Sequence, residues 1–170
     1  HRLAFTPLGA WAPQLQRMID LRNILGLRSP IHSLARILNP LGARCVMQSI
    51  FHPGYQAVHR EASRLLGDTA VVIKGEGGEI EANPDATCHL YGTQGGENWD
   101  EEWPQLSPAR HVKPASLDPQ LLLAVWKGEA HDAYGALAIQ ATLAVALRGL
   151  GSSREQAFAR AQTVWAQRHG

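Results

Sequence analysis

Residues 45–74 read CVMQSIFHPGYQAVHREASRLLGDTAVVIK, and this stretch decides the fold. Its two ends, residues 45–51 and 69–74, are short apolar runs of the kind that form buried strands. Between them, Pro53 begins a helical pattern that Gly67 ends. A strand, a helix and a strand in this order predict two parallel strands joined by a crossover helix. We expect the apolar side of this helix to face the sheet: Tyr55, Val58, Ala62, Leu65 and Leu66.

Further elements are predicted on both sides of this unit. Before it we expect two helices, from Pro13 to Gly26 with Leu15, Met18, Ile19 and Ile24 inward, and from Ser29-Pro30 to Asn39-Pro40. After it we expect a tight turn at 75–78, strands at 79–82 and 86–91, a long loop or β extension at 92–117, and three helices. The signals for these helices are Asp118-Pro119 with a stop at Gly128, an apolar run over 133–147, and a capping box of Ser152 and Glu155. The predicted fold class is therefore α/β: a small mixed or mostly parallel sheet covered by helices, in a single domain over residues 1–170.

The charge is distributed unevenly along the 170 residues. Residues 1–60 contain seven arginines, no lysine and a single acid, Asp20, whereas residues 61–120 contain eleven acids and four bases. This asymmetry favours a face that binds anions, with a phosphorylated small molecule or nucleic acid as the partner. The alternative is that the arginines are simply solvated. No apolar run is long enough for a membrane span, so no membrane partner is expected.

The two cysteines, Cys45 and Cys88, each lie in an apolar, strand-like stretch. They form no Cys-x-x-Cys pair and no disulfide framework. Buried, unreactive thiols are therefore expected, and a cytoplasmic location is consistent with them.

Residues 25–40, LGLRSPIHSLARILNP, are the second informative stretch. Arg28, His32 and Arg36 are spaced four apart, so a helix would place them on one face, suited to an anion or an aromatic carboxylate. A solvated basic helix face is the alternative. Lys74 ends a presumed parallel strand, where such sheets bind ligands. We expect these four cations to open on the same cleft and to bind the substrate or anion.

The sequence of residues 25–40 is similar, without gaps, to LGVRTIFNLLGPLTNP, a signature of anthranilate phosphoribosyltransferase and its relatives in glycosyl transferase family 3. The similarity continues through FTPLGAWAPQLQRMIDLRNILGLR, SIFHPGYQ and VVIKGEGGEIEANP, and covers about half of the chain. With histidine at position 32, the segment resembles more closely a divergent bacterial branch of anthranilate phosphoribosyltransferase-like proteins. Some members of this branch are described as nucleic-acid binders. The resemblance implies a fold like the C-terminal domain of nucleoside phosphorylases and phosphoribosyltransferases, as the C-terminal part of a longer chain.

The same resemblance assigns site residues. The substrate-recognising arginine of the family falls on Arg28, and His32 replaces an asparagine. The family's phosphate loop, GTGGD, would precede His1. The family's acidic segment, GEDGLDE, falls on residues 75–81, where Ile80 replaces an aspartate and only Glu81 keeps its carboxylate as a metal ligand.

These correspondences assign no catalytic residue and imply no cofactor in this fragment, with magnesium expected only if the complete protein is active. They imply a substrate-side domain of a phosphoribosyltransferase-like transferase that is not competent on its own. The alternative is a non-catalytic nucleic-acid or polyanion-binding protein that uses the arginine-rich face. Whether the complete protein is an enzyme stays open, and the resemblance allows a homodimer formed through the segment that would precede His1.

Overall fold

The computed structural model of the chain describes residues 4–75, 79–108, 110–112, 116 and 118–168. They divide into two compact units, one up to Pro40 and one from Leu41 onward, and each is described by itself. None of the described helices is both long enough and apolar enough to cross a membrane.

The first unit contains four short helices: α1 (Leu8–Trp11), α2 (Pro13–Asp20), α3 (Arg22–Leu25) and α4 (Ile31–Leu34). The helix predicted from Pro13 to Gly26 is present, although Leu21 interrupts it, and Gly26 ends it with a left-handed φ of 69°. The helix predicted between Ser29 and Asn39 is α-helical only over α4, and the chain then continues in hydrogen-bonded turns as far as Ile37.

The start of α4 also differs from the prediction. No side-chain hydrogen bond caps this helix. The ring of His32 instead turns back onto Ser29, and its Nδ1 lies 3.3 Å from the backbone nitrogen of Ser29. This local contact with Ser29 competes with the role that the sequence predicted for Ser29 as a helix cap.

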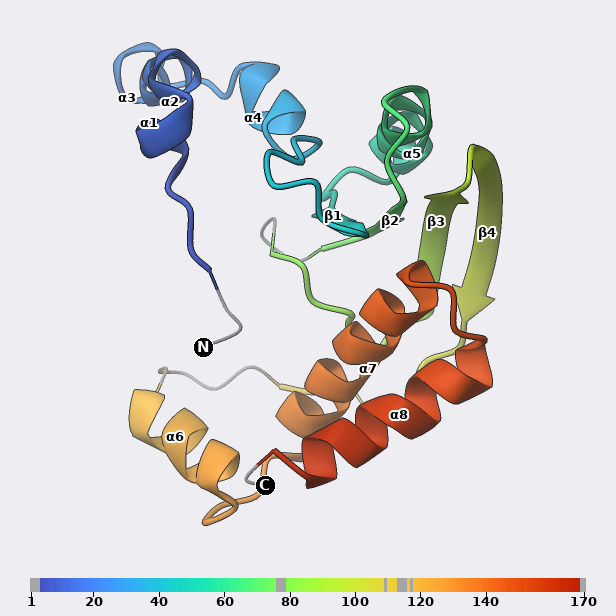
Figure 1. Cartoon of the computed structure of the whole chain (residues 1–170). Coiled ribbons are helices and arrows are strands. Elements are labelled where there is room, and N and C mark those ends of the chain that lie inside the picture. The colour runs from blue at the N-terminus through green and yellow to red at the C-terminus, as the bar shows by residue number, and fades with distance from the viewer. Residues whose placement is uncertain (1–3, 76–78, 109, 113–115, 117, 169–170) are drawn as a thin grey trace. The chain divides into compact units, whose positions relative to one another are not determined.

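The second unit is built on a four-stranded sheet in the order β1 (Val46–Ser49), β2 (Ala70–Ile73), β3 (Cys88–Gln94) and β4 (Glu97–Trp103) (Figure 1). β1 and β2 are parallel and pair from Val46 with Ala70 to Ser49 with Ile73, as the strand–helix–strand pattern predicted. The other two pairs are antiparallel. The prediction of an α/β fold with a small mixed sheet is confirmed, and its parallel part is the β1–β2 pair.

Residues 88–103 form a regular hairpin of β3 and β4. The first part of the region predicted as a loop or β extension, residues 92–103, is therefore β structure. Gly95 and Gly96 connect β3 to β4 with φ of 60° and 86°, the conformation of a two-residue turn that favours glycine at both positions.

The strand predicted at 79–82 is wrong. The backbone N–H of Ala82 donates to Thr142 Oγ1 at 3.0 Å rather than to a neighbouring strand. Residues 76–78 of the predicted tight turn lie outside the described residues.

The helices of this unit are η1 (Pro53–Tyr55), α5 (Gln56–Leu65), α6 (Pro119–Lys127), α7 (Ala133–Gly149) and α8 (Arg154–Ala166). α6 begins and ends where predicted: the Asp118 side chain accepts a hydrogen bond from the Gln120 N–H, and Gly128 ends the helix. The capping box of α8 lies one residue later than predicted, because Ser153 and Gln156 form it.

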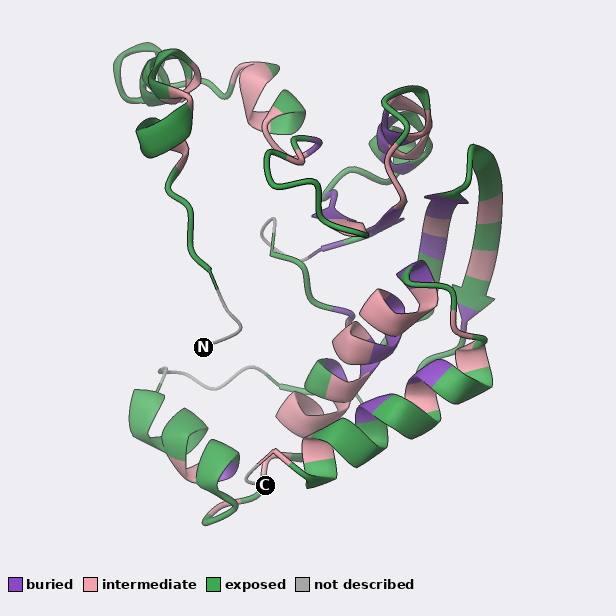
Figure 2. Cartoon of the chain, in the orientation of Figure 1, coloured by how far each residue is buried: buried purple, intermediate pink, exposed green. Residues whose placement is uncertain are grey.

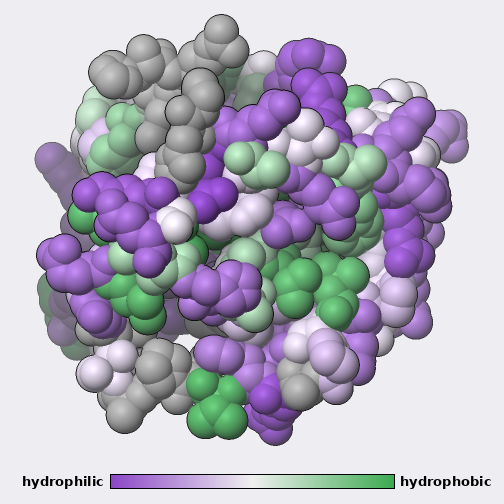
Figure 3. Space-filling view, turned by 90° about the horizontal axis from the view of Figure 1, so that it is seen from below, coloured by the Kyte–Doolittle hydropathy of each residue, from purple (hydrophilic) through white to green (hydrophobic). Residues whose placement is uncertain are grey.

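One face of the sheet packs against α7 and α8 and forms the apolar core (Figure 2). Val71 and Ile73 of β2 lie in this core with alanines of both helices. Elsewhere apolar residues reach the surface, and on the face seen from below they lie in separate patches between hydrophilic groups (Figure 3).

On the other face of the sheet α5 packs against β2 and β3 and is hydrogen-bonded to Gln48 of β1, and here the predicted orientation is wrong. The buried residues of α5 are polar: Gln56, His59 and Ser63. Four of the apolar residues expected to face the sheet are exposed instead: Tyr55, Val58, Leu65 and Leu66. The reason lies in β1, where buried Gln48 needs hydrogen-bond partners that only the polar side of α5 supplies.

Candidate functional site

The carboxyl ends of β1 and β2 meet at one edge of the sheet, and Lys74 is exposed there, directly after β2. Gly75, the next residue, is buried, and a Cβ added to it would lie 1.6 Å from Ser49 Oγ and 2.2 Å from the Glu79 carbonyl oxygen. Only glycine fits so close to the end of β1. The chain after β2 therefore lies close against the end of β1, and the exposed Lys74 precedes this contact at the edge where parallel strands bind ligands.

Glu81 lies further along the same connection. Its side chain is exposed, and its Oε1 accepts a 3.5 Å hydrogen bond from the Tyr134 hydroxyl of α7. The Tyr134 ring stacks on the His111 ring with centroids 4.3 Å apart. The backbone N–H of His111 donates a hydrogen bond to Asp85 Oδ2 at 2.5 Å. A polar cluster of Glu81, Asp85, His111 and Tyr134 thus holds residues from three segments together.

This cluster does not make a metal site. Among the described residues there is no group of three or more histidines, cysteines, aspartates or glutamates placed to hold a metal ion. Magnesium bound to a pyrophosphate uses hard oxygen ligands, commonly one or two carboxylates beside the phosphates. At the position of the family's second carboxylate this chain has Ile80. The described residues around Glu81 therefore do not fit a resident magnesium ion.

The other three predicted anion ligands lie in the first unit. Arg28 is exposed in the connection between α3 and α4, His32 is half-buried within α4, and Arg36 is half-buried in the turns that follow α4. Only α4 is α-helical here, and the chain continues in hydrogen-bonded turns as far as Ile37. Arg28 and His32 lie in one short segment, with His32 Nδ1 3.2 Å from the Ser29 carbonyl oxygen. A cleft shared with Lys74 stays a prediction.

A buried polar network near the end of β1 was missed by the sequence analysis. Gln48 Nε2 donates to Ser63 Oγ at 2.7 Å, and Gln48 Oε1 lies 2.9 Å from His59 Nδ1. An amide oxygen only accepts hydrogen bonds, so this contact is satisfied when His59 carries its proton on Nδ1. The signal was present in the sequence as Gln56, His59 and Ser63 at helical spacing, but the apolar residues of the same helix repeat equally well.

Both cysteines are free and partly buried. Burial raises the pKa of the Cys45 thiol, and it raises the pKa of the Cys88 thiol to about 11. Both thiols are therefore protonated at neutral pH, which agrees with the expectation that they are unreactive.

The sequence was compared with known proteins, and no family model matches it. An uncharacterized protein of Aquifex aeolicus (strain VF5) is 37% identical over 84 residues, which are 49% of this chain and 27% of that protein. The uncharacterized protein YbiB of Escherichia coli (strain K12) is 31% identical over 86 residues, again 49% of this chain and 27% of the relative.

Anthranilate phosphoribosyltransferase of Synechococcus sp. (strain CC9311) is 29% identical over 164 residues, which are 91% of this chain and 47% of that protein. The chain thus spans about half the length of this relative and about a quarter of the two uncharacterized proteins. Over most of its length it is distantly similar to anthranilate phosphoribosyltransferases, which suggests a related transferase family.

Proposed function

We propose that the chain is the substrate-side domain of a phosphoribosyltransferase-like transferase, and that Arg28 of the first unit and Lys74 of the second each bind an anionic group of its substrates. The observation that carries the proposal is the display of Lys74 at the carboxyl edge of the parallel strand pair. The distant similarity to anthranilate phosphoribosyltransferases over 91% of the chain supports it. His32 and Arg36 supply further donors beside Arg28, and the anions bound are a carboxylate or a phosphate.

On its own the 170-residue chain should not transfer phosphoribose to anthranilate. Ile80 stands in place of a carboxylate, and no group of ligands for a metal surrounds Glu81 among the described residues. Incubation of the purified chain with magnesium, anthranilate and phosphoribosyl pyrophosphate is the direct assay. Product above the level of a heat-denatured control would contradict this part of the proposal.

Substrate binding is tested separately by calorimetric titration with phosphoribosyl pyrophosphate and with anthranilate. Arg28→Ala and Lys74→Ala should each weaken the binding of one or both compounds by about tenfold, because each removes a charge-assisted hydrogen bond. Arg160→Ala and Lys127→Ala are matched controls, since these residues are also exposed and lie on α8 and α6. Equal losses in all four variants, or no binding of either compound to the parent chain, would overturn the proposal.

The competing proposal is a non-catalytic module that binds nucleic acid or another polyanion through the first unit. The observation that favours it is the exposure of Arg17, Arg22 and Arg28 in a segment whose one acid, Asp20, accepts a hydrogen bond from Gln16. Four engaged arginines would cost about a hundred-fold in affinity for a labelled single strand between 50 and 200 mM salt. Arg28→Ala with Arg36→Ala should lower both the affinity and the salt slope. Binding that ignores salt would exclude this alternative.

A further inference from the structure

β4 is the last strand in the order of the sheet, and among the described strands it has a neighbour on one side only (Figure 1). Its seven residues pair with β3 without a break in register, from Glu97 with Gln94 to Trp103 with Cys88. The strand contains no proline and no bulge. The backbone N–H and C=O groups that point away from β3 therefore form a continuous edge that another strand can pair with.

The side chains of this edge decide what can pair with it. Four of the seven residues of β4 are acids: Glu97, Asp100, Glu101 and Glu102. The whole hairpin, residues 88–103, contains no lysine or arginine. Asp100 is paired with Arg60, yet its side chain stays 60% exposed, and that of Glu102 is 66% exposed beside His89. A second copy of β4 paired antiparallel about Asp100 would place this carboxylate opposite itself, which is unfavourable. The edge thus disfavours self-association and favours a cationic strand.

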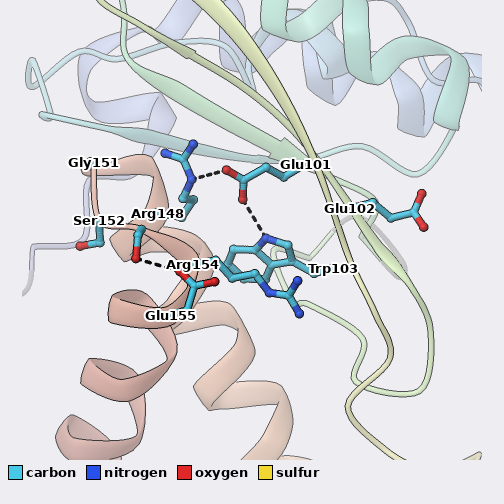
Figure 4. A pocket seen from close by; sticks show the side chains of 9 residues that line it. Glu101, Glu102, Trp103, Arg148, Gly151, Ser152, Arg154 and Glu155 are labelled. Atoms are coloured by element: carbon cyan, nitrogen blue, oxygen red, sulfur yellow. Dashed lines mark hydrogen bonds and ion pairs between the residues drawn. The ribbon is translucent and has the colours of Figure 1, made fainter.

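A hollow of about 540 Å³ lies beside the carboxyl end of the same strand. Its walls are Glu101, Glu102 and Trp103 of β4, Arg148 of α7 and the chain from Gly151 to Glu155 (Figure 4). Glu101 is fixed in this wall, because its two oxygens accept from Arg148 Nε at 2.6 Å and from Trp103 Nε1 at 2.9 Å.

Figure 4 shows the carboxylate of Glu102 on the opposite side of the strand from that of Glu101, as the alternation of a β-strand requires. Asp100 is two residues before Glu102, so strand alternation places its side chain on the same side as that of Glu102. The carboxylates of Asp100 and Glu102 therefore point to one side of the strand, and the carboxylate of Glu101 faces the polar hollow on the other.

We propose that the outer edge of β4 binds an extended cationic peptide segment of another protein, which adds to the sheet as a fifth strand. Main-chain hydrogen bonds to β4 supply the common part of the affinity. Every second side chain of the segment is a lysine or arginine beside Asp100 and Glu102. The side chains between them are small and polar and lie over the hollow. This site uses none of the residues of the proposed substrate site and stands independently of it.

The test uses the 170-residue chain and a fluorescein-labelled, end-capped peptide of alternating threonine and lysine, with fluorescence anisotropy as the readout. Binding is expected, and two control peptides separate its causes. A peptide of alternating threonine and glutamate should not bind. A threonine–lysine peptide with N-methylated backbone nitrogens keeps its charge but cannot donate to β4, so its affinity should fall by about tenfold or more.

A pair of charge-matched variants locates the site. Glu102→Lys should weaken binding by about tenfold, whereas Glu129→Lys, which makes the same charge change at an exposed position after α6, should have less than about a twofold effect. Glu102→Gln is the milder second variant if Glu102→Lys unfolds the chain, as judged by circular dichroism. Hydrogen exchange should slow at amides of Glu97–Trp103 when the peptide is present. Equal weakening by both lysine variants, full affinity of the N-methylated peptide, or absence of binding at about 1 mM peptide would each overturn the proposal.

Discussion

The two faces of the sheet are covered by helices of opposite character. α7 buries alanines and Val145 against Val71 and Ile73 of β2, whereas α5 buries Gln56, His59 and Ser63 and leaves Val58 and Leu65 in solvent. Both helices have apolar residues at helical spacing, so the spacing alone does not decide which side of a helix packs on a sheet. The opposing strand decides it, because an unpaired polar side chain such as Gln48 is costly to bury.

The two contacts also differ in how they respond to change. An apolar contact loses stability in proportion to the volume that is removed. A buried polar contact contributes little net stability when all its groups are paired, but it becomes strongly unfavourable when one partner is lost. Four substitutions test this difference, beginning with the largest expected effect.

Leu90→Ala should destabilise the second unit most, because Leu90 of β3 is fully buried in the core against α7 and α8. The expected loss in the free energy of unfolding is about 2–5 kcal/mol. Urea denaturation followed by circular dichroism measures it. Leu122→Ala is the control, since this side chain is 67% exposed on α6 and should change stability by no more than about 0.5 kcal/mol. Similar losses in both variants would contradict the assigned core.

Gln48→Ala should lower the free energy of unfolding by about 1–3 kcal/mol, because it leaves Ser63 Oγ and His59 Nδ1 buried without their partner. Ser63→Ala, made alone and with Gln48→Ala, completes a double-mutant cycle in the same urea assay. The two residues should be coupled by about 0.5–3 kcal/mol. Additive effects would show that the polar network does not hold α5 on the sheet.

Glu61→Gln should have a smaller, pH-dependent effect at the outer side of α5. Hydrogen bonds from Arg64, and a further one from Asn98, lower the pKa of Glu61 to about 2 from 4.5. Because the folded-state pKa is the lower one, the stabilisation by the carboxylate is complete above about pH 4.5 and is lost as the pH falls toward 2. The difference in urea midpoint between the parent and Glu61→Gln should therefore shrink from pH 6 to pH 2. A difference that does not change with pH would contradict this ion pair.

Leu65→Ser should have the smallest effect, within about 0.5 kcal/mol, because the side chain is exposed on the outer face of α5. The apolar spacing of α5 predicted that Leu65 faces the sheet, and there the same substitution would cost several times more. The urea midpoint of Leu65→Ser thus distinguishes the two orientations of α5. A loss comparable to that of Leu90→Ala would restore the orientation that the sequence predicted.

The candidate site shows a similar division between what was predicted and what was not. The position of Lys74 at the carboxyl edge of β2 followed from the strand–helix–strand pattern, since parallel pairing fixes which strand ends meet. The stripe of Arg28, His32 and Arg36 assumed a regular helix, whereas only α4 is α-helical and turns follow it, so their common face stays a prediction. The cluster of Asp85, His111 and Tyr134 had no sequence signal, because its members are far apart in the chain and are joined only by folding.

By itself the sequence determined the features that depend on neighbouring residues. Asp118 and Gly128 mark the ends of α6, and the apolar runs mark the parallel strands, because caps and strand propensities act within a few residues. Only the tertiary structure decided which face of α5 is buried and how Glu101 holds Arg148 beside β4. These outcomes depend on partners 15 and 47 residues away, Gln48 with Ser63 and Glu101 with Arg148, whose hydrogen bonds exist only once the sheet and its helices have come together.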